Sequence, residues 1–234
     1  MARVSFAGLC AAVLVLSLTS GAALGLLGIR ISRTDDPHFA FLTWNLMLAW
    51  IPFAVALGLY AAHRAGANAL ALAVGFVVWL LFLPNAPYLV TDYIHLAADS
   101  RVPLWFDFAL LGAFSVSGLL LGFASVYLAQ AVVSERAGVV AGWAMTGGVF
   151  MLTAVGVYVG RVLRFNSWDA LQEPGPLVSL ALARLEDPFG NPLLVATVVA
   201  FTAFLTFAYV GLYFTSLVLM DGWRSFGPGA RRRT

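Results

Sequence analysis

The stretch ALALAVGFVVWLLFLPNAPYLVTDYIHL, residues 69–96, indicates the fold class of this chain. No charged residue occurs from 65 to 91. A membrane-spanning helix needs roughly 20 largely apolar residues, and a helix bonds its own backbone groups where no water is present. Pro84 and Pro87 then interrupt the run, because proline lacks an N–H and strains the preceding turn. The stretch predicts a transmembrane helix over 69–84 that breaks and restarts.

The same pattern recurs on both sides of this stretch. Further charge-free runs occupy residues 4–29, 37–63, 108–134, 137–160 and 188–220. They are too long and too uniformly apolar for the alternating strands of a membrane barrel. We therefore predict an all-α, polytopic transmembrane bundle, formed by residues 1–234 as a single domain. Its six expected spans are about 5–28, 39–62, 69–84, 104–131, 138–163 and 193–220.

Composition indicates that the bilayer is the solvent of this protein. Of the 234 residues, 62% are hydrophobic and only 10% are charged, whereas a soluble domain has roughly 25% charged residues. The formal net charge of +2 is too small and too spread to indicate a nucleic-acid partner. Cys10 is the sole cysteine and lies in an apolar run, which favours an inert thiol over a disulfide or a metal cluster.

Arginine placement predicts the orientation in the membrane. With six spans both termini share a side, which would hold seven of the thirteen arginines, including the tail at 231–233. That side would hold only two of the eleven acids. We therefore expect the termini in the cytoplasm. The first run is longer than a signal-peptide core, so we favour an uncleaved first span.

Glycines spaced four residues apart predict close helix contacts, because small residues let helix backbones approach each other in lipid. Such pairs occur at Gly21/Gly25, Gly118/Gly122, Gly138/Gly142 and Gly156/Gly160.

Polar residues gather on the side away from the termini, first after the broken third span. In a restarted helix, Tyr88, Asp92, His95 and Asp99 would fall on one stripe, and Asn85 could cap the helix start. A broken helix with a polar stripe at membrane depth is typical of a binding site. The alternative is an interfacial helix that lies flat with its polar side in water.

Two further segments at this side carry charge. Asp107 begins the fourth span, where the helix dipole favours an acid. Arg161 and Arg164 share one face at the end of the fifth span. These arginines could reach lipid headgroups, clamp an anion through their planar forks, or pair with Asp92, Asp107 or Asp169 between helices.

The blocks LPNAPYLVTDYIHL, WFD and GRVLRFNSWD resemble the signature blocks of a bacterial membrane-protein family, domain of unknown function 1361. The resemblance covers about Asn45 to Tyr213. It implies a multi-pass membrane protein of bacterial origin, which would lie in the inner membrane. It assigns no activity and no residue role.

The long connection at about 165–192 contains an apolar segment at 176–185 that is too short to span. We expect it to be an interfacial or re-entrant helix that could cover the polar residues.

Three kinds of function fit these features. The first is a site at the outer face that binds or processes an anionic or lipid-linked substrate. Asp92 and His95 would serve as base and acid, or would bind a divalent metal with Asp107 or Asp169. The candidate catalytic residues are Asp92, His95 and Asp107. The candidate ligand-binding residues are Asn85, Tyr88, Arg161, Arg164, Asn166, Trp168 and Asp169.

The alternatives are a transporter or channel subunit and a non-catalytic accessory protein. Six spans without an internal repeat are few for a carrier, so transport would require a homo-oligomer. An accessory role would use the glycine spacings and the many tryptophans, which also suit ordinary membrane interfaces. No cofactor motif was found, and the sequence leaves the choice between enzyme and binding protein open.

Overall fold

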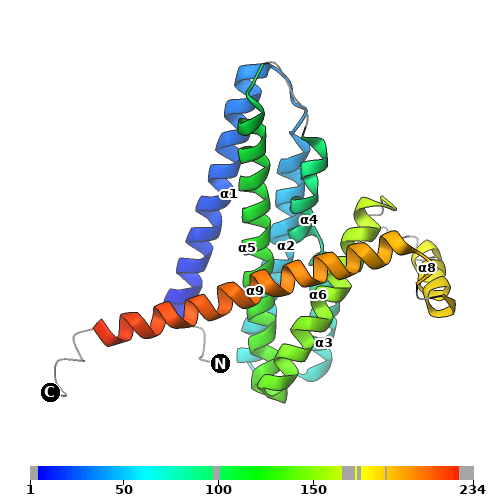
Figure 1. Cartoon of the computed structure of the whole chain (residues 1–234). Coiled ribbons are helices and arrows are strands. Elements are labelled where there is room, and N and C mark those ends of the chain that lie inside the picture. Colours follow the sequence, from blue (N-terminus) through cyan, green and yellow to red (C-terminus); the bar gives the residue numbers. More distant parts are fainter. Residues whose placement is uncertain (1–4, 97–100, 165–171, 173–174, 188, 227–234) are drawn as a thin grey trace.

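A computed structural model gives the fold of the protein (Figure 1). It describes residues 5–96, 101–164, 172, 175–187 and 189–226. Within these ranges every regular element is a helix, as the charge-free runs predict.

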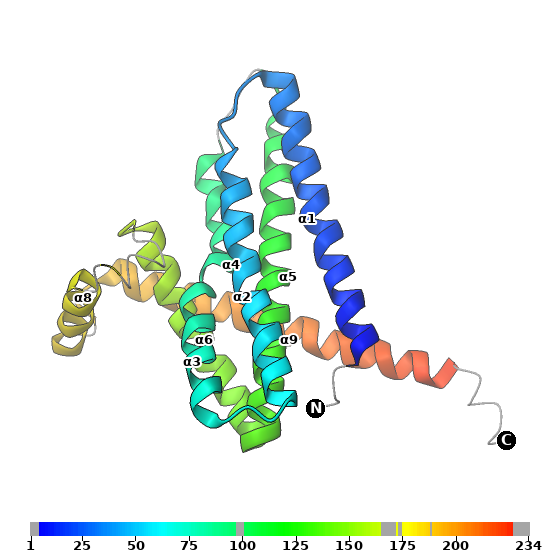
Figure 2. The same ribbon diagram turned by 180° about the vertical axis from the view of Figure 1, so that it is seen from behind.

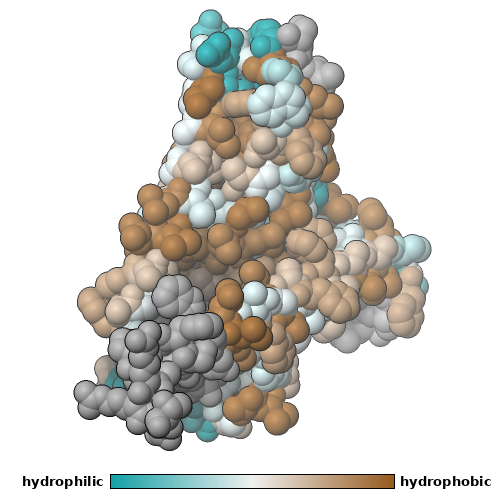
Figure 3. All heavy atoms as spheres, turned by 60° about the vertical axis from the view of Figure 1, so that its left-hand side comes forward, coloured by the Kyte–Doolittle hydropathy of each residue, from teal (hydrophilic) through white to brown (hydrophobic). Residues whose placement is uncertain are grey.

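Six helical segments are long and apolar enough to cross a membrane, which confirms the predicted fold class. The segments are α1 (Phe6–Thr34), α2 (Phe41–Arg64), the broken segment Ala69–His95, α5 (Leu104–Ala137), α6 (Val139–Arg161) and α9 (Pro192–Phe226). The short helix expected at 176–185 is α8 (Gly175–Glu186), which lies beside the bundle in Figures 1 and 2. Apolar side chains cover the middle of the molecule, and hydrophilic ones gather where α1 ends (Figure 3). The chain is a multi-pass membrane protein.

Helix α5 is the central element and the most buried of the six. Helices α1 and α2, which precede α5 in the chain, pack on it, and so does α6, which follows it. Leu110, Phe114 and Leu121 of α5 are fully buried in the core. Because α5 contacts the other central elements, any charged group it carries at its ends lies within reach of several helices.

Helices α1 and α5 both extend beyond their predicted ends. Helix α1 continues to Thr34, where Asp35 takes a left-handed conformation with φ of 50°. Helix α5 continues to Ala137 and ends at Gly138, which has φ of +94°, a positive value that glycine adopts readily because it has no Cβ. In both helices the added turns carry charged residues, so charge marks the edge of the hydrocarbon region and not the end of the helix.

The third span breaks where the two prolines predict it. Helix α3 (Ala69–Phe82) is followed by one turn, α4 (Asn85–Tyr88), and then by the 3₁₀ helix η1 (Leu89–His95). Asn85 is the first residue of α4, and its side-chain amide donates to the Phe82 carbonyl at 2.9 Å. The restart is therefore not one continuous α-helix. Because a 3₁₀ helix has three residues per turn, the polar residues do not stay on a single stripe.

Helix α9 crosses the bundle instead of running along it (Figures 1 and 2). It packs mainly on α6, and the Tyr209 hydroxyl donates to the Gln130 side-chain oxygen of α5 at 2.6 Å. At 35 residues, α9 is about 52 Å long, well above the roughly 30 Å of a bilayer core. A helix with this excess length can be accommodated in a bilayer by tilting.

The Gly118/Gly122 pair of α5 receives the broken segment, as the glycine spacing predicts. A Cβ added at Gly118 would overlap the Ala86 carbonyl oxygen of α4, and one added at Gly122 would lie 3.2 Å from the Ala86 Cβ. By contrast, no atom would lie within 4 Å of a Cβ added at Gly21 or Gly25 of α1.

We expect Gly118→Ala to lower the free energy of unfolding by about 1–3 kcal/mol, because α4 would have to move away from α5. Thermal unfolding of the detergent-solubilised protein measures the effect. Gly21→Ala is the matched control: it adds the same methyl group in open space, where alanine is the better helix former. Equal melting temperatures for the two variants would contradict the close contact.

Candidate functional site

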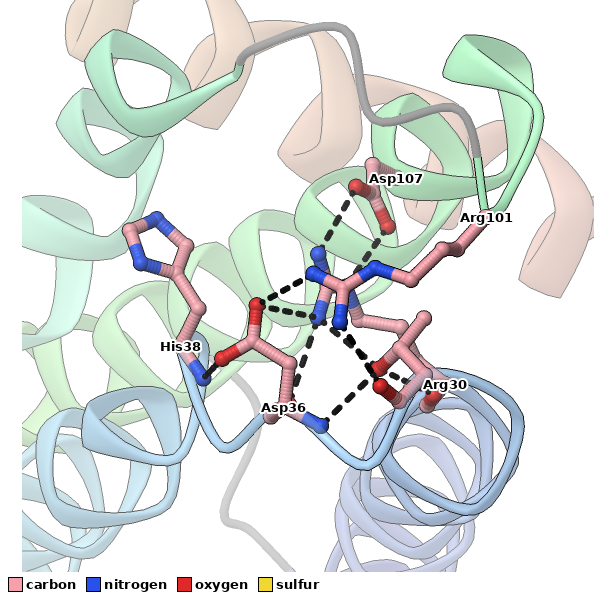
Figure 4. Close-up of polar contacts among 6 residues, drawn as sticks. Arg30, Asp36, His38, Arg101 and Asp107 are labelled. Atoms are coloured by element: carbon pink, nitrogen blue, oxygen red, sulfur yellow. Dashed lines mark hydrogen bonds and ion pairs between the residues drawn. The ribbon is translucent and has the colours of Figure 1, made fainter.

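Charged residues from five segments lie in the half of the bundle toward the end of α1. The end of α6 lies nearer the middle of the bundle than the end of α1 does (Figures 1 and 2). We call this region the rim. It is formed by the end of α1, the connection 35–40, the start of α5, η1 and the end of α6. Two clusters of arginine and aspartate are found there. The first joins α1 to α5 and is drawn in Figure 4. The second joins η1 to α2 and α6.

In the first cluster, Arg30 of α1 forms a two-pronged ion pair with Asp107 of α5. Its Nε lies 3.0 Å from Oδ1 of Asp107 and its Nη2 lies 3.4 Å from Oδ2 (Figure 4). Both residues are buried, at 2% and 1% exposed. Each also suits its helix end: Arg30 lies near the C-terminus of α1, and Asp107 lies in the first turn of α5.

The remaining donors of Arg30 bind the chain that leaves α1. Its Nη1 donates to the Thr34 hydroxyl at 3.4 Å and to the Asp36 carbonyl at 3.3 Å, and its guanidinium lies 4.5 Å from the centre of the Phe39 ring. Arg101 adds an outer layer, because it donates to the Thr34 carbonyl at 2.8 Å and to the Asp36 carboxylate at 3.0 Å. This cluster fixes the α1–α2 connection against α5.

In the second cluster, Asp92 of η1 is fully buried and accepts hydrogen bonds from two helices. The Arg161 Nη2 of α6 binds one carboxylate oxygen, and the Asn45 side-chain amide of α2 binds the other at 3.1 Å. This arrangement matches the sequence-based alternative in which the arginines pair with acids between helices. A buried carboxylate with both oxygens bound is held in one position.

Thr91 and Tyr88 complete the support of Arg161. The Arg161 Nε donates to the Thr91 hydroxyl at 2.8 Å, and that hydroxyl donates to the Tyr88 carbonyl at 2.6 Å. The Tyr88 ring lies under the guanidinium, 4.2 Å from its central carbon. Three sides of the guanidinium are therefore fixed by residues of the broken helix.

The fourth side of Arg161 is open. Among the described residues its Nη1 group has no hydrogen-bond partner, and the side chain is 18% exposed. Arg164 follows in a left-handed conformation with φ of 60°, exposed and without an ion pair in the described part of the chain. The rim thus presents two arginines with donors that bind no described side chain.

His95 does not share this environment. Its ring lies 4.9 Å from that of Phe41, at the start of α2, and 6.4 Å from that of His38, in the connection before α2, measured between ring centres. No hydrogen bond joins it to Asp92 in the described residues. His95 is therefore at the rim, turned toward α2, while Asp92 faces the interior.

The structure separates the predicted catalytic residues. Asp92 and Asp107 belong to different clusters, and each is bound to its own arginine. Among the residues described, no group of three His, Cys, Asp or Glu side chains is placed to hold a metal ion. Asn166, Trp168, Asp169 and Asp99 lie outside the described residues. Of the ligand-binding candidates, Tyr88 and Arg161 meet directly, and Asn85 binds the end of α3 instead.

Sequence reasoning missed Arg30, Asp36, Asn45 and Thr91 as parts of these clusters. Two signals could have found some of them. Arg30 ends the first apolar run and Asp107 begins the fourth, so their charges lie at the same membrane depth. Asn45 is a lone amide inside an apolar span, and such residues usually bind a neighbouring helix.

Comparisons with known proteins identify a family for this chain and no activity. No curated protein and no solved structure matches the chain. One family model, described as a protein of unknown function (DUF1361), matches residues 44–212. That range is well over half of the chain and contains most of α2, the elements from α3 to α6, the rim arginine Arg161 and most of α9. The chain therefore belongs to the DUF1361 family of proteins of unknown function.

Proposed function

We propose that this protein binds the anionic group of a membrane-resident amphiphile at the rim, with Arg161 and Arg164 as the recognition residues. The ligand class is a lipid or a lipid-linked molecule with a phosphate or carboxylate head. The open Nη1 group of the otherwise fixed Arg161 is the observation that carries this proposal.

A fixed arginine with a free edge suits anion binding for a physical reason. Ordering a free arginine side chain on binding costs entropy, and here Asp92, Thr91 and Tyr88 have already ordered Arg161. The two N–H groups of Nη1 can donate charge-assisted hydrogen bonds to one anionic group. Arg164 supplies a second cation close by in sequence, at the exposed end of α6.

This geometry supports general acid–base catalysis by the two buried acids less well than it supports anion binding. A general base needs a lone pair directed at its substrate, whereas the Asp92 and Asp107 carboxylates are buried and occupied by arginine and amide donors. We therefore favour ligand binding over catalysis at these two acids.

We also propose that the rim faces away from the cytoplasm of a bacterial inner membrane. Seven of the thirteen arginines, and only two of the eleven acids, would then lie on the cytoplasmic side. Under this proposal Arg161 and Arg164 face the outer leaflet, where a lipid-linked anion would be found.

Arg164→Gln tests the proposal without disturbing the buried pair. We expect it to weaken binding of a short-chain phosphatidic acid about tenfold, because a charge-assisted hydrogen bond contributes about 1.5–3 kcal/mol. Isothermal titration calorimetry of the protein in a non-ionic detergent measures the dissociation constant. Titration with a phosphatidylcholine of the same chain length separates the contribution of the headgroup charge to binding from that of the apolar chains.

Arg33→Gln is the matched control, since Arg33, like Arg164, is an exposed arginine at the C-terminal end of a rim helix. It should leave the dissociation constant unchanged. If both variants weakened binding equally, the attraction would be a general effect of positive charge, and the proposed site would be wrong.

A further inference from the structure

A groove between α1 and α2 lies apart from both charged clusters. Its walls are Ser20 and Leu24 of α1 and Thr43, Trp44, Met47 and Trp50 of α2, and its volume is about 530 Å³. That volume is within the range of about 300–1,000 Å³ that holds small ligands. We call it the α1–α2 groove.

The groove exists because α1 and α2 both pack on α5 and have little contact with each other. A hydrogen bond of 3.2 Å from the Trp50 indole to the Ser20 hydroxyl joins them at the deep end. At the other end, Ala40 lines the groove where the α1–α2 connection reaches the rim. The walls between these ends are apolar and open to the side: Trp44 is 52% exposed and Met47 is 48% exposed.

The depth of the groove matches one leaflet of a bilayer. Ala40 and Trp50 are ten residues apart, which is about 15 Å along a helix. The hydrocarbon core of a bilayer is about 30 Å thick, so one leaflet contributes about 15 Å. The shallow end lies at Ala40, where the connection 35–40 of the rim meets α2, and the deep end is closed by the Ser20–Trp50 hydrogen bond.

From this match we infer that the α1–α2 groove binds one acyl chain of a phospholipid from the leaflet on the rim side, with the lipid headgroup at the rim. This inference goes beyond the proposed function, because the groove uses α1 and α2 while the anion site uses η1 and α6. A lipid chain is the occupant because the groove opens sideways into the bilayer and has no charged wall.

Filling the groove tests the inference. Native mass spectrometry of the purified wild-type protein should show one retained phospholipid. The fraction of protein that retains lipid should be about tenfold lower in Thr43→Trp, because the larger side chain occupies the space of the acyl chain. Leu18→Trp is the control, because Leu18 is an exposed residue of α1 outside the groove walls. It should retain lipid like the wild type, and so should Arg164→Gln, which separates this result from the anion site.

Two results would overturn the inference. One is equal lipid retention by Thr43→Trp and Leu18→Trp. The other is a wild-type dimer that Thr43→Trp breaks, which would show that a second copy of the chain fills the groove.

A second measurement covers the case in which Thr43→Trp does not fold. The probe is a phospholipid brominated on its acyl chain, present as a minor component of proteoliposomes. It should quench the fluorescence of Trp44 at mole fractions that leave the fluorescence of other lipid-facing tryptophans unchanged. The Trp44 signal is the difference between the wild type and Trp44→Phe. Quenching that merely follows the bulk mole fraction would contradict a bound chain.

Discussion

Replacing Asp107 by alanine is expected to lower the free energy of unfolding by about 3–5 kcal/mol, the largest effect of any single change considered for this protein. The cause is the buried charge left behind: Arg30 is 2% exposed and would lose both bonds to the carboxylate. A cation in that position has no water to replace its partner. Reversible unfolding of the detergent-solubilised protein, followed by circular dichroism, measures the loss.

The double variant Arg30→Met/Asp107→Leu separates loss of a partner from loss of the pair. Replacing a buried ion pair by apolar residues of similar size is often neutral, so this variant should recover most of the stability lost in Asp107→Ala. Asp36→Ala is the control at the same rim, because its carboxylate is one-third exposed. Its ion pair with the half-exposed Arg101 contributes at most about 1 kcal/mol, and its contact with the Arg30 guanidinium, at 3.9 Å, is too long for a hydrogen bond. A loss in Asp36→Ala as large as that in Asp107→Ala would contradict the central place of the buried pair.

Asp92→Ala is expected to show the second-largest effect, again about 3–5 kcal/mol. It removes the acceptor of both Arg161 and Asn45 from a fully buried position. It should also weaken phosphatidic acid binding, because Arg161 would no longer be held with its free edge at the rim. Unfolding in detergent and calorimetric titration measure the two effects on one sample.

The more conservative Asp92→Asn distinguishes support from catalysis. The amide keeps one acceptor for Arg161 and lacks the charge, so we expect a partial loss of stability, about 1.5–3 kcal/mol, and a partial loss of binding. A catalytic base would behave differently: the amide variant would fold and bind like the wild type, and only turnover would be lost. That outcome would refute our interpretation of Asp92 as a positioning residue.

The helical membrane fold could be predicted because its signal is local. Each span is a charge-free run in the sequence, and the break after α3 follows from two prolines that remove N–H donors wherever they occur. The helix ends were harder to predict. Helix α1 continues past Arg30 because that arginine finds a buried partner, which no property of residues 5–34 shows.

The partners in the two clusters could not be predicted for the same reason. Arg30 and Asp107 are 77 residues apart, and Asn45 and Asp92 are 47 apart. Both pairings depend on how α1, α2 and η1 sit around α5. The periodicity of the sequence indicates which face of a helix is buried, but not which helix packs against that face. Arg161 was a predicted ligand-binding residue, and an ion pair with an acid of another helix was one of its three predicted roles. Its open Nη1 could be seen only once Thr91 and Tyr88 were placed.

The steep crossing of α9 had no signal in the sequence either. The apolar run from 193 to 220 fits a span in any orientation. Its direction depends on contacts with distant helices, such as the hydrogen bond between Tyr209 and Gln130 and the edge-on contact of Trp143 with Tyr213.

The most direct test of this account is whether the two charged clusters share one side of the membrane. In a Cys10→Ser background, single cysteines at exposed positions can be labelled with a membrane-impermeant maleimide in vesicles of known orientation. We expect Asp35→Cys at the α1–α2 connection and Arg164→Cys at the end of α6 to react from one side. Ala65→Cys, after α2, should react from the other. If Arg164→Cys reacted from the same side as Ala65→Cys, there would be no common rim and the proposed site would not exist.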